Sequence, residues 1–422
     1  MDFSLSSDQL LVRDTVRQFM ETEMRPLLRE YDRTEKFPAE QIRRLGELGC
    51  CGMLIPEEYG GSATDAVTYA LMIEEVARVC ASTAVTLSVT NSVAAAPILK
   101  HGTEAQKKKY LPRLARGEIL GGFCLTEPGA GSDAAGIQTR AVRDGDAYIV
   151  NGTKSWVTNG GFSGVYVLFA KTDPSVGARG VTAFLVEPTS PGFRVSRYED
   201  KMGLRLSRSA EIVFEDCRVP AENLLGVEGQ GLRVALGALD GGRIGIAAQS
   251  VGVAQGAFEA AVRYAKQRRT FGHPIADYQA IQWMIADMAT EIEAARALMQ
   301  YAASLRDVEA AREVAEVKSS TGGPGFNPAV SGPLSSGVST PEAGARRSAV
   351  GPHSARAKLY ASEMANRVCA RAVQIHGSVG YSRETDVERY YRDARVLTIY
   401  EGTSEMQRLV IARDLLRARS SQ

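Results

Sequence analysis

The sequence predicts an α+β protein of several domains: a helical domain, then a small antiparallel β domain, then a domain resembling a four-helix bundle. Three observations support this fold class. The chain has 422 residues, more than a single hydrophobic core usually serves. Apolar residues recur at helical intervals in its first and last parts, whereas its middle has short β-rich runs between turn dipeptides. We therefore expect domains at residues 1–120, 121–231 and 232–422.

Helix-start signals support the first domain. Ser6 and Gln9 have the spacing of a capping box ahead of an amphipathic stretch, and Thr103 and Gln106 repeat that spacing. Helices are predicted at residues 39–48, 66–80 and 103–114.

The second and third domains differ in the length of their predicted elements. Strands are predicted at residues 148–150, 165–170, 181–186 and 210–214, separated by turn residues. Helices are predicted at residues 232–268, 278–306, 355–375 and 404–417, long enough for an up-and-down bundle. Residues 319–353 are rich in Ser, Gly and Pro, which predicts a flexible insertion without chemistry.

Charge and cysteine usage exclude several classes of function. Lys plus Arg number 50 and Asp plus Glu number 49, so no strong field would recruit nucleic acid or anionic lipid. The six cysteines show no zinc-type pairs and read as reduced thiols, and no metal site is expected. The N-terminal stretch has neither signal-peptide nor transit character, and no apolar run is expected to span a membrane. A bacterial-type cytoplasmic location is expected, with the mitochondrial matrix as the alternative.

Two motifs in the β-rich part could contact a ligand. The run FCLTEPGAGSD at residues 123–133 leads from a strand into a Gly-rich turn, where backbone N–H groups could approach a ligand closely. The alternative is that this run forms only a turn and contacts no ligand. The run KSWVTNG at residues 154–160 holds Trp156, whose indole could cover a flat ring, or could be an ordinary core residue.

Two further motifs lie in the last part. The run QRRTFG at residues 267–272 ends a helix, where its basic residues could meet a pyrophosphate or only offset the helix dipole. The run YEGTSE at residues 400–405 opens a helix with Thr403 as a candidate N-cap, and its glutamates could be ordinary solvated residues.

Taken together, these runs resemble the acyl-CoA dehydrogenase family. FCLTEPGAGSD, WVTNGG, RRTFG, the stretch at residues 374–377 and IYEGTSE occur in the order of that family, over about residues 7–417 apart from the insertion. LDGGRIGIAAQ and YEGTSEMQRLVIA resemble its short-chain branch. The resemblance implies the three-domain fold of that family, an FAD cofactor, an acyl-CoA substrate, an electron-transferring flavoprotein as partner and a homotetramer.

The resemblance also implies roles for individual residues. Those expected to bind FAD within the subunit are Phe123, Leu125, Thr126, Gly131, Ser132, Trp156, Thr158, Thr403 and Glu405. Those expected to reach the FAD of a neighbouring subunit are Arg268, Thr270, Phe271, Gln279, Gln374 and Gly377. The expected substrate contacts are Ser132, Asp240, Arg243 and Gly402.

Glu401 is the expected catalytic base. The α hydrogen of a thioester is only weakly acidic, so its removal needs a carboxylate within hydrogen-bond reach and stabilisation of the resulting charge. The resemblance implies that flavin N5 accepts the β hydrogen as hydride. Burial is expected to raise the pKa of Glu401 above its usual value of about 4.3. Some relatives carry the base at the position of Gly242, which cannot serve here.

Two residues near the end of the helix predicted at residues 355–375 bear on this assignment. Ser378 departs from the family pattern, and His376 could be mistaken for a catalytic residue. Ser378 replaces a usual glycine, which would weaken FAD binding if that position needs positive φ or close approach to the pyrophosphate of FAD. His376 is interpreted as a spacer at the helix end. The alternatives to the leading function are an oxidase, a dehydrogenase of branched, aromatic or dicarboxylic acyl groups, and a non-catalytic or nucleic-acid-associated relative.

Overall fold

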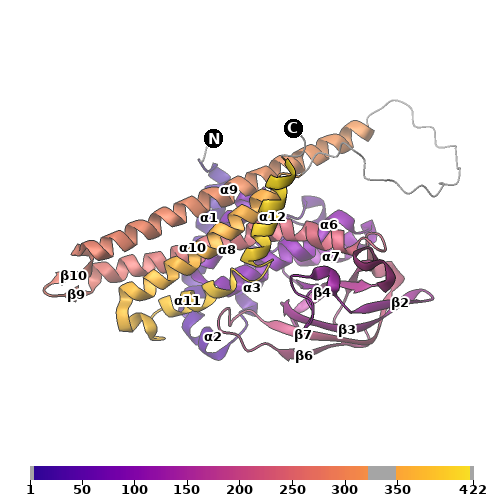
Figure 1. The fold of residues 1–422 in the computed structure, drawn as a ribbon, viewed down its shortest axis with the longest axis horizontal. Coiled ribbons are helices and arrows are strands. Elements are labelled where there is room, and N and C mark those ends of the chain that lie inside the picture. The colour runs from indigo at the N-terminus through magenta and orange to yellow at the C-terminus, as the bar shows by residue number, and fades with distance from the viewer. Residues whose placement is uncertain (1–3, 322–347, 419–422) are drawn as a thin grey trace.

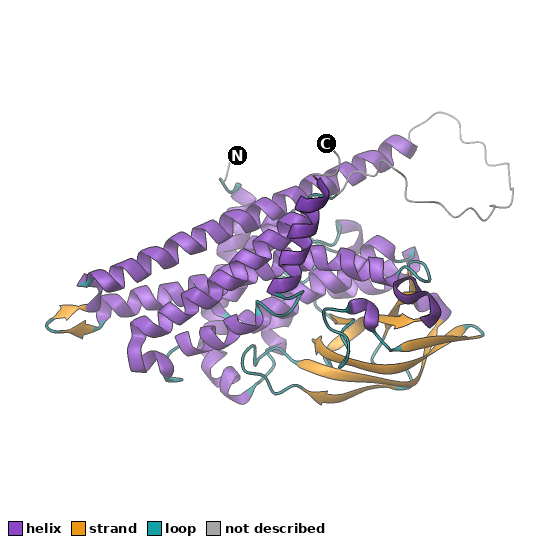
Figure 2. Cartoon of the chain, viewed as in Figure 1, coloured by secondary structure: helices purple, strands orange, loops and turns teal. Residues whose placement is uncertain are grey.

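The computed structural model describes residues 4–321 and 348–418, and it confirms the predicted fold class. Its helices lie mainly on one side of the molecule and its strands on the other (Figure 2). The helices before the sheet are α1 (Ser7–Phe19), α2 (Leu28–Thr34), α3 (Ala39–Glu47), α4 (Ala66–Val79), α5 (Ala81–Ser88), α6 (Ala96–His101) and α7 (Glu104–Ala115). π-Helical segments at Met20–Met24 and Val89–Ala95 continue α1 and α5.

Both predicted capping boxes form. The Gln9 N–H donates to Ser6 Oγ at 3.2 Å, and the Ser6 N–H donates to Gln9 Oε1 at 3.0 Å. Thr103 and Gln106 make the same reciprocal pair at 3.2 and 3.0 Å. These bonds satisfy donors that the first turn of a helix leaves free, which explains why α1 and α7 begin where the sequence predicts.

The sheet follows the order β6-β7-β3-β2-β4-β5-β8, with β1 paired to β4. Its strands are β1 (Leu120–Cys124), β2 (Arg140–Asp144), β3 (Ala147–Thr158), β4 (Ser163–Lys171), β5 (Val181–Val186), β6 (Phe193–Tyr198), β7 (Ser209–Pro220) and β8 (Leu224–Leu225). Most pairs are antiparallel, but β1 lies parallel to β4, a pairing that alternating local patterns do not reveal. β5 has the bounds that the sequence predicts, whereas β3, β4 and β7 are longer than the predicted runs.

The last part of the chain contains the long helices. They are α8 (Gly231–Gln267), α9 (Gln279–Thr321), α10 (Val350–His376), α11 (Val387–Val396) and α12 (Ser404–Ala418), and a hairpin of β9 (Arg269–Thr270) and β10 (His273–Pro274) joins α8 to α9. In Figure 1, α8, α9 and α10 run side by side, and α12 crosses them. The ends of the predicted insertion are helical, and its residues 322–347 lie outside the described residues.

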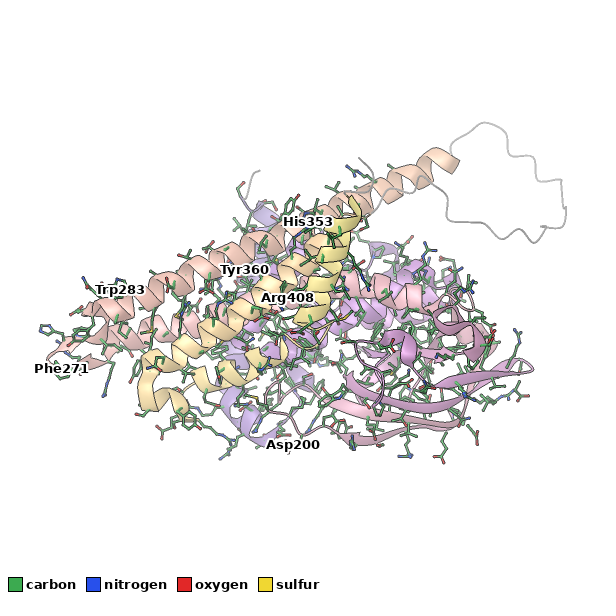
Figure 3. The ribbon with its side chains drawn as sticks, viewed as in Figure 1. Asp200, Phe271, Trp283, His353, Tyr360 and Arg408 are labelled. Atoms are coloured by element: carbon green, nitrogen blue, oxygen red, sulfur yellow. The ribbon has the colours of Figure 1, made fainter. Side chains whose placement is uncertain are left out.

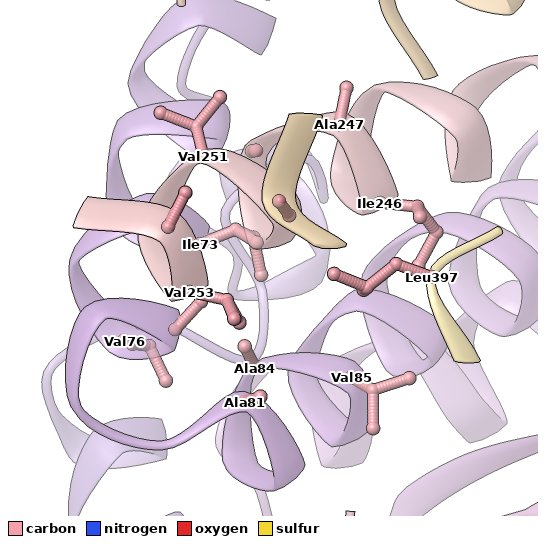
Figure 4. Packing of buried hydrophobic residues seen from close by; sticks show 14 of the residues in the cluster. Ile73, Val76, Ala81, Ala84, Val85, Ile246, Ala247, Val251, Val253 and Leu397 are labelled. Carbon is pink, nitrogen blue, oxygen red and sulfur yellow. The ribbon is translucent and has the colours of Figure 1, made fainter. Parts of the chain in front are cut away.

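One hydrophobic core joins the first helices to the long helices. Ile73 and Val76 of α4 and Val85 of α5 pack with Val251 and Val253 of α8 (Figure 4). The sheet has a separate interior cluster that includes Phe184 and Phe214. Because the helical parts share a core and the sheet packs against them, the junction between sheet and helices can hold a cavity.

The segment Ala81–His101 is long and apolar enough to satisfy a length-and-composition test for a membrane span, unlike the expectation from sequence. However, 89% of the tested window is buried inside the structure, as in the core helix of a packed protein. All six cysteines are free and buried, as expected from the sequence.

Candidate active site

A cavity of about 700 Å³ lies where the sheet, the first helices and the long helices meet. Such a volume suits a small molecule or cofactor. The residues singled out from the sequence that line this cavity are Phe123, Leu125, Thr126, Gly131, Ser132, Trp156, Thr158, Arg243, Glu401, Gly402 and Thr403. The fold therefore brings together motifs that lie far apart in the sequence.

The loop after β1 forms one wall of the cavity, and hydrogen bonds from β3 anchor it. Lys154 of β3 is fully buried, and its Nζ donates to the Leu125 carbonyl at 3.1 Å and to Glu127 Oε1 at 2.7 Å. Glu127 also accepts from the N–H of Gln138 at 2.6 Å and from the N–H of Thr139 at 3.0 Å. A Cβ added at Gly131 would meet no atom within 4 Å, so this part of the loop presents open backbone to the cavity.

Trp156 lies on a β-bulge that turns its side chain toward the cavity. Lys154 pairs with Ile212 of β7 and Val157 pairs with Ala210, so the β3 segment carries one extra residue. Trp156 itself has φ 59° and is 59% exposed. The alternative that Trp156 is a core residue is therefore wrong.

Glu401 faces α8 at a position that lacks a side chain. A Cβ added at Gly242 would lie 2.5 Å from Glu401 Oε2, so glycine is needed there for the carboxyl group to occupy its place. That oxygen is shielded from solvent and has no hydrogen-bond partner among the described residues. Glu401 and Gly402 both have left-handed backbones, with φ 52° and 86°.

The electrostatic surroundings of Glu401 favour the uncharged acid. Burial raises the pKa of Glu401 to about 7, against the opposing effects of the Arg243 and Lys358 charges. Arg243 Nη1 forms an ion pair with Asp240 Oδ1 at 2.5 Å. A carboxyl group with a pKa close to neutral can accept a proton and release it again, as a general base must.

The turn that carries Glu401 is anchored by three neighbours. Gln407 Nε2 donates to the carbonyls of Glu401 and Gly402 at 3.1 and 2.9 Å. Lys358 Nζ also donates to the Gly402 carbonyl, at 2.8 Å. Thr403 Oγ1 accepts from the Met406 N–H at 3.3 Å, the bond expected of the predicted N-cap.

The remaining expected site residues do not line the cavity. Figure 3 shows Phe271 at the tip of the hairpin, at the far end of the long helices from the cavity-lining Asp200. Phe271 is 90% exposed. Arg268, Thr270 and Gln279 belong to the same hairpin and helix ends, Gln374 and Gly377 lie at the end of α10, and Glu405 is exposed in the first turn of α12. The expected roles of Arg268, Thr270, Phe271, Gln279, Gln374 and Gly377 toward a neighbouring subunit stay predictions. The expected role of Glu405 in binding FAD within its own subunit also stays a prediction.

The structure shows the backbone of Ser378 and the contacts of His376 at the end of α10. Gly377 has φ 63°, whereas Ser378 is not among the residues with positive φ, so the Cβ of Ser378 causes no backbone strain. His376 is buried, stacks on Tyr264 with ring centroids 4.3 Å apart, and its Nδ1 lies 2.8 Å from the Ala372 carbonyl oxygen. These contacts support the interpretation of His376 as a structural residue.

Sequence reasoning missed several residues at the cavity. Val85, Val89 and Val93 line it from α5 and the π-helical segment, and their spacing of four residues was a signal that could have been found. Lys358 and Gln407 contact the Glu401 turn from α10 and α12, but nothing in their local sequence marks them.

Comparison with known proteins agrees with these motifs. The family models for the N-terminal, middle and C-terminal domains of acyl-CoA dehydrogenases match residues 6–118, residues 122–217, and residues 229–321 with 336–416. The short-chain specific acyl-CoA dehydrogenase of Clostridium acetobutylicum is 42% identical over 99% of this chain and 100% of its own length.

Two solved structures extend the comparison. The butyryl-CoA dehydrogenase of Megasphaera elsdenii has 42% identity and a TM-score of 0.86, covering 99% of this chain and 100% of its own. A glutaryl-CoA dehydrogenase of Mycobacterium smegmatis in complex with FADH2 has 31% identity and a TM-score of 0.83, covering 97% and 95%. Because the family models span most of the sequence and the identities extend over whole chains, this protein belongs to the acyl-CoA dehydrogenase family.

Proposed function

We propose that this chain dehydrogenates a short acyl-CoA thioester between its α and β carbons, with FAD as the cofactor and Glu401 as the base. The observation that carries this proposal is the shielded Glu401 carboxyl group on the wall of a cavity that the predicted flavin-binding loop and Trp156 also line. The relatives named above act on short acyl-CoA thioesters or contain reduced FAD, which supports the same reaction.

The residues of the cavity fit a flavin. A half-exposed indole at Trp156 offers a flat apolar face, and the open backbone at Gly131 leaves room for close approach. Thr126, Ser132 and Thr158 add hydroxyl groups at the same wall. FAD bound there would supply the acceptor for the hydrogen and electron pair that leave the β carbon.

The chain itself supplies the acid–base chemistry. Glu401 would take the α proton. Because its pKa is raised, Glu401 is a stronger base toward this weakly acidic C–H group than an ordinary carboxylate. Gly242 leaves the carboxyl group room to face the substrate, and the two left-handed residues at 401 and 402 set the direction of the turn. The substrate loses one proton and one hydride, and a trans-2-enoyl thioester remains.

The ends of the substrate would meet different surroundings. Val85, Val89 and Leu239 form apolar walls for an acyl chain. Arg243, held by Asp240, offers a positive charge toward the CoA part. We further propose that electrons pass to an electron-transferring flavoprotein and that the enzyme works as a homotetramer. We also propose a cytoplasmic location, because the relatives named above are bacterial.

Replacing Glu401 with Gln tests the proposed role of the base. Gln keeps the size of the side chain but cannot accept the α proton, so Glu401→Gln should slow flavin bleaching by butyryl-CoA at least about 100-fold. FAD content should stay unchanged, and the exposed Glu58→Gln should bleach as the wild type does. Full activity of Glu401→Gln would refute the assignment, and oxygen consumption without another acceptor would indicate an oxidase instead.

A further inference from the structure

Lys358 is a buried lysine directly behind the turn that carries Glu401. Its side chain comes from α10 and is fully buried. Its Nζ donates to the Gly402 carbonyl at 2.8 Å. Burying an ammonium group costs free energy unless it finds partners and a compensating charge, so a lysine at this place calls for a physical reason.

The hydrogen bond alone does not explain the lysine. Gln407 Nε2 already donates to the same Gly402 carbonyl at 2.9 Å, and it also holds the Glu401 carbonyl. A neutral donor could therefore anchor the turn. What Lys358 adds is a positive charge, in the same region as the shielded carboxyl group of Glu401.

We propose that Lys358 is a positioning residue for the base: its buried ammonium group fixes the turn at Gly402 and places a positive charge behind the carboxyl group of Glu401. The inference rests on the proposed role of Glu401.

Lys358 and Glu401 act on each other electrostatically. Burial lowers the pKa of Lys358 to about 8, and the charge of Glu401 opposes that effect. In turn, Lys358 and Arg243 limit the rise that burial causes in the pKa of Glu401. The other ionisable groups that act on the pair are Tyr69 of α4, the adjacent Tyr400, Glu363 of α10 and Glu405 of α12.

Removing the charge should change how Glu401 titrates. In Lys358→Met, which has a similar length and no charge, the midpoint for ionisation of Glu401 should move up by about one pH unit. At acid pH, kcat/KM should then fall about tenfold below the wild type, because fewer molecules hold an ionised base. Lys358→Gln keeps a donor without the charge and should move the midpoint in the same direction.

Gln407→Met is the matched control. It removes a neutral donor from the same carbonyl but leaves the ammonium group in place. This variant should leave the midpoint of Glu401 where it is in the wild type. A shift as large as that of Lys358→Met would show that anchoring of the turn, and not charge, controls the titration, and would overturn the proposal.

The readout is the carboxyl infrared band of the holoenzyme across pH, with Glu401→Gln subtracted to isolate the signal of Glu401. It needs no turnover, so a wild type that titrates as expected but fails to bleach with acyl-CoA would refute the proposed function alone. An unchanged midpoint in folded Lys358→Met or Lys358→Gln would overturn the role of Lys358. Failure of both variants to fold would also overturn it, by assigning Lys358 a purely structural role.

Discussion

The side chain of Glu401 occupies the space beside Gly242, between α8 and the turn ahead of α12. The carboxyl group fits only because Gly242 has no Cβ, and the backbone of Glu401 adopts a left-handed conformation that non-glycine residues seldom adopt. Strain of this kind persists only where surrounding contacts hold it, here the bonds from Gln407 and Lys358 to the turn.

Gly242→Ala should therefore displace the base. The added methyl group would lie 2.5 Å from Glu401 Oε2, closer than any contact allows, so the carboxyl group must move. A displacement of about 1 Å should slow flavin bleaching by about 100-fold. Gly237→Ala on the same helix is the control, because an added Cβ there meets nothing within 4 Å. Equal rates for the two variants would contradict the packing argument.

The raised pKa of Glu401 also predicts how stability depends on pH. The folded-state pKa of about 7 lies above the usual 4.5, so the stability gained from the bound proton is present below about pH 4.5 and is lost as pH rises through 7. Glu401→Gln has no such loss. Its free energy of unfolding should exceed that of the wild type by up to about 3 kcal/mol above pH 8.

Thermal unfolding of the two proteins from pH 5 to 9 measures this difference. Glu58→Gln, with an exposed side chain, should follow the wild type at every pH. Parallel curves for the wild type and Glu401→Gln would contradict the burial of the carboxyl group.

The loop between β1 and β2 depends on one buried ion pair. Lys154 of β3 bonds Glu127 and the Leu125 carbonyl, and the Ser155 N–H donates to the Thr126 carbonyl at 2.9 Å. These bonds tie the cavity wall to β3 beside the bulge at Trp156. The loop and the indole are therefore positioned by the same strand.

Lys154→Met should cost about 3 kcal/mol in the free energy of unfolding, because it leaves Glu127 buried without its opposite charge. It should also lower FAD content, since the loop that would contact the flavin loses its anchor. Denaturant unfolding and the flavin absorbance of purified protein measure the two effects. Lys107→Met breaks a lysine–glutamate pair at 2.9 Å whose glutamate is exposed, and should cost no more than about 1 kcal/mol. Similar losses for both variants would contradict the importance of burial.

The molecule as a whole divides its predicted FAD residues between two distant places. All of the first set except Glu405 line the cavity. The second set lies at the hairpin and at the end of α10, and Figure 1 shows the hairpin at one tip of the long helices. None of the second set lines the cavity of its own chain, which is the arrangement expected if the second set serves a neighbouring subunit.

Phe271→Ala tests this division. The side chain is 90% exposed, so its loss should change the free energy of unfolding by no more than about 0.5 kcal/mol. If Phe271 contacts the FAD of another subunit, the variant should nevertheless release its flavin more readily during dialysis. Val142→Ala, at another exposed apolar site, should retain flavin as the wild type does. Equal retention by both variants would contradict a role for the hairpin in binding FAD.

Several features could be predicted from sequence because they are local. Each capping box joins two residues that are three positions apart. The long helices can be recognised from the periodicity of their apolar residues. The parallel pairing of β1 with β4 could not be predicted, because it joins segments separated by β2 and β3. α5 was missed because it is short and buried on all sides, so it lacks an amphipathic pattern. α11 was also missed, although it is no shorter than α3, which was predicted.

The sequence by itself determined the order of helical and β-rich parts, the family motifs and the identity of the candidate base. Only the tertiary structure decided that Trp156 faces the cavity, that Gly242 makes room for Glu401, and that Lys358 stands behind it. The reason is that local patterns depend on neighbours along the chain. The space and electrostatic field at Glu401 come from α8, α10 and α12, which only folding brings together.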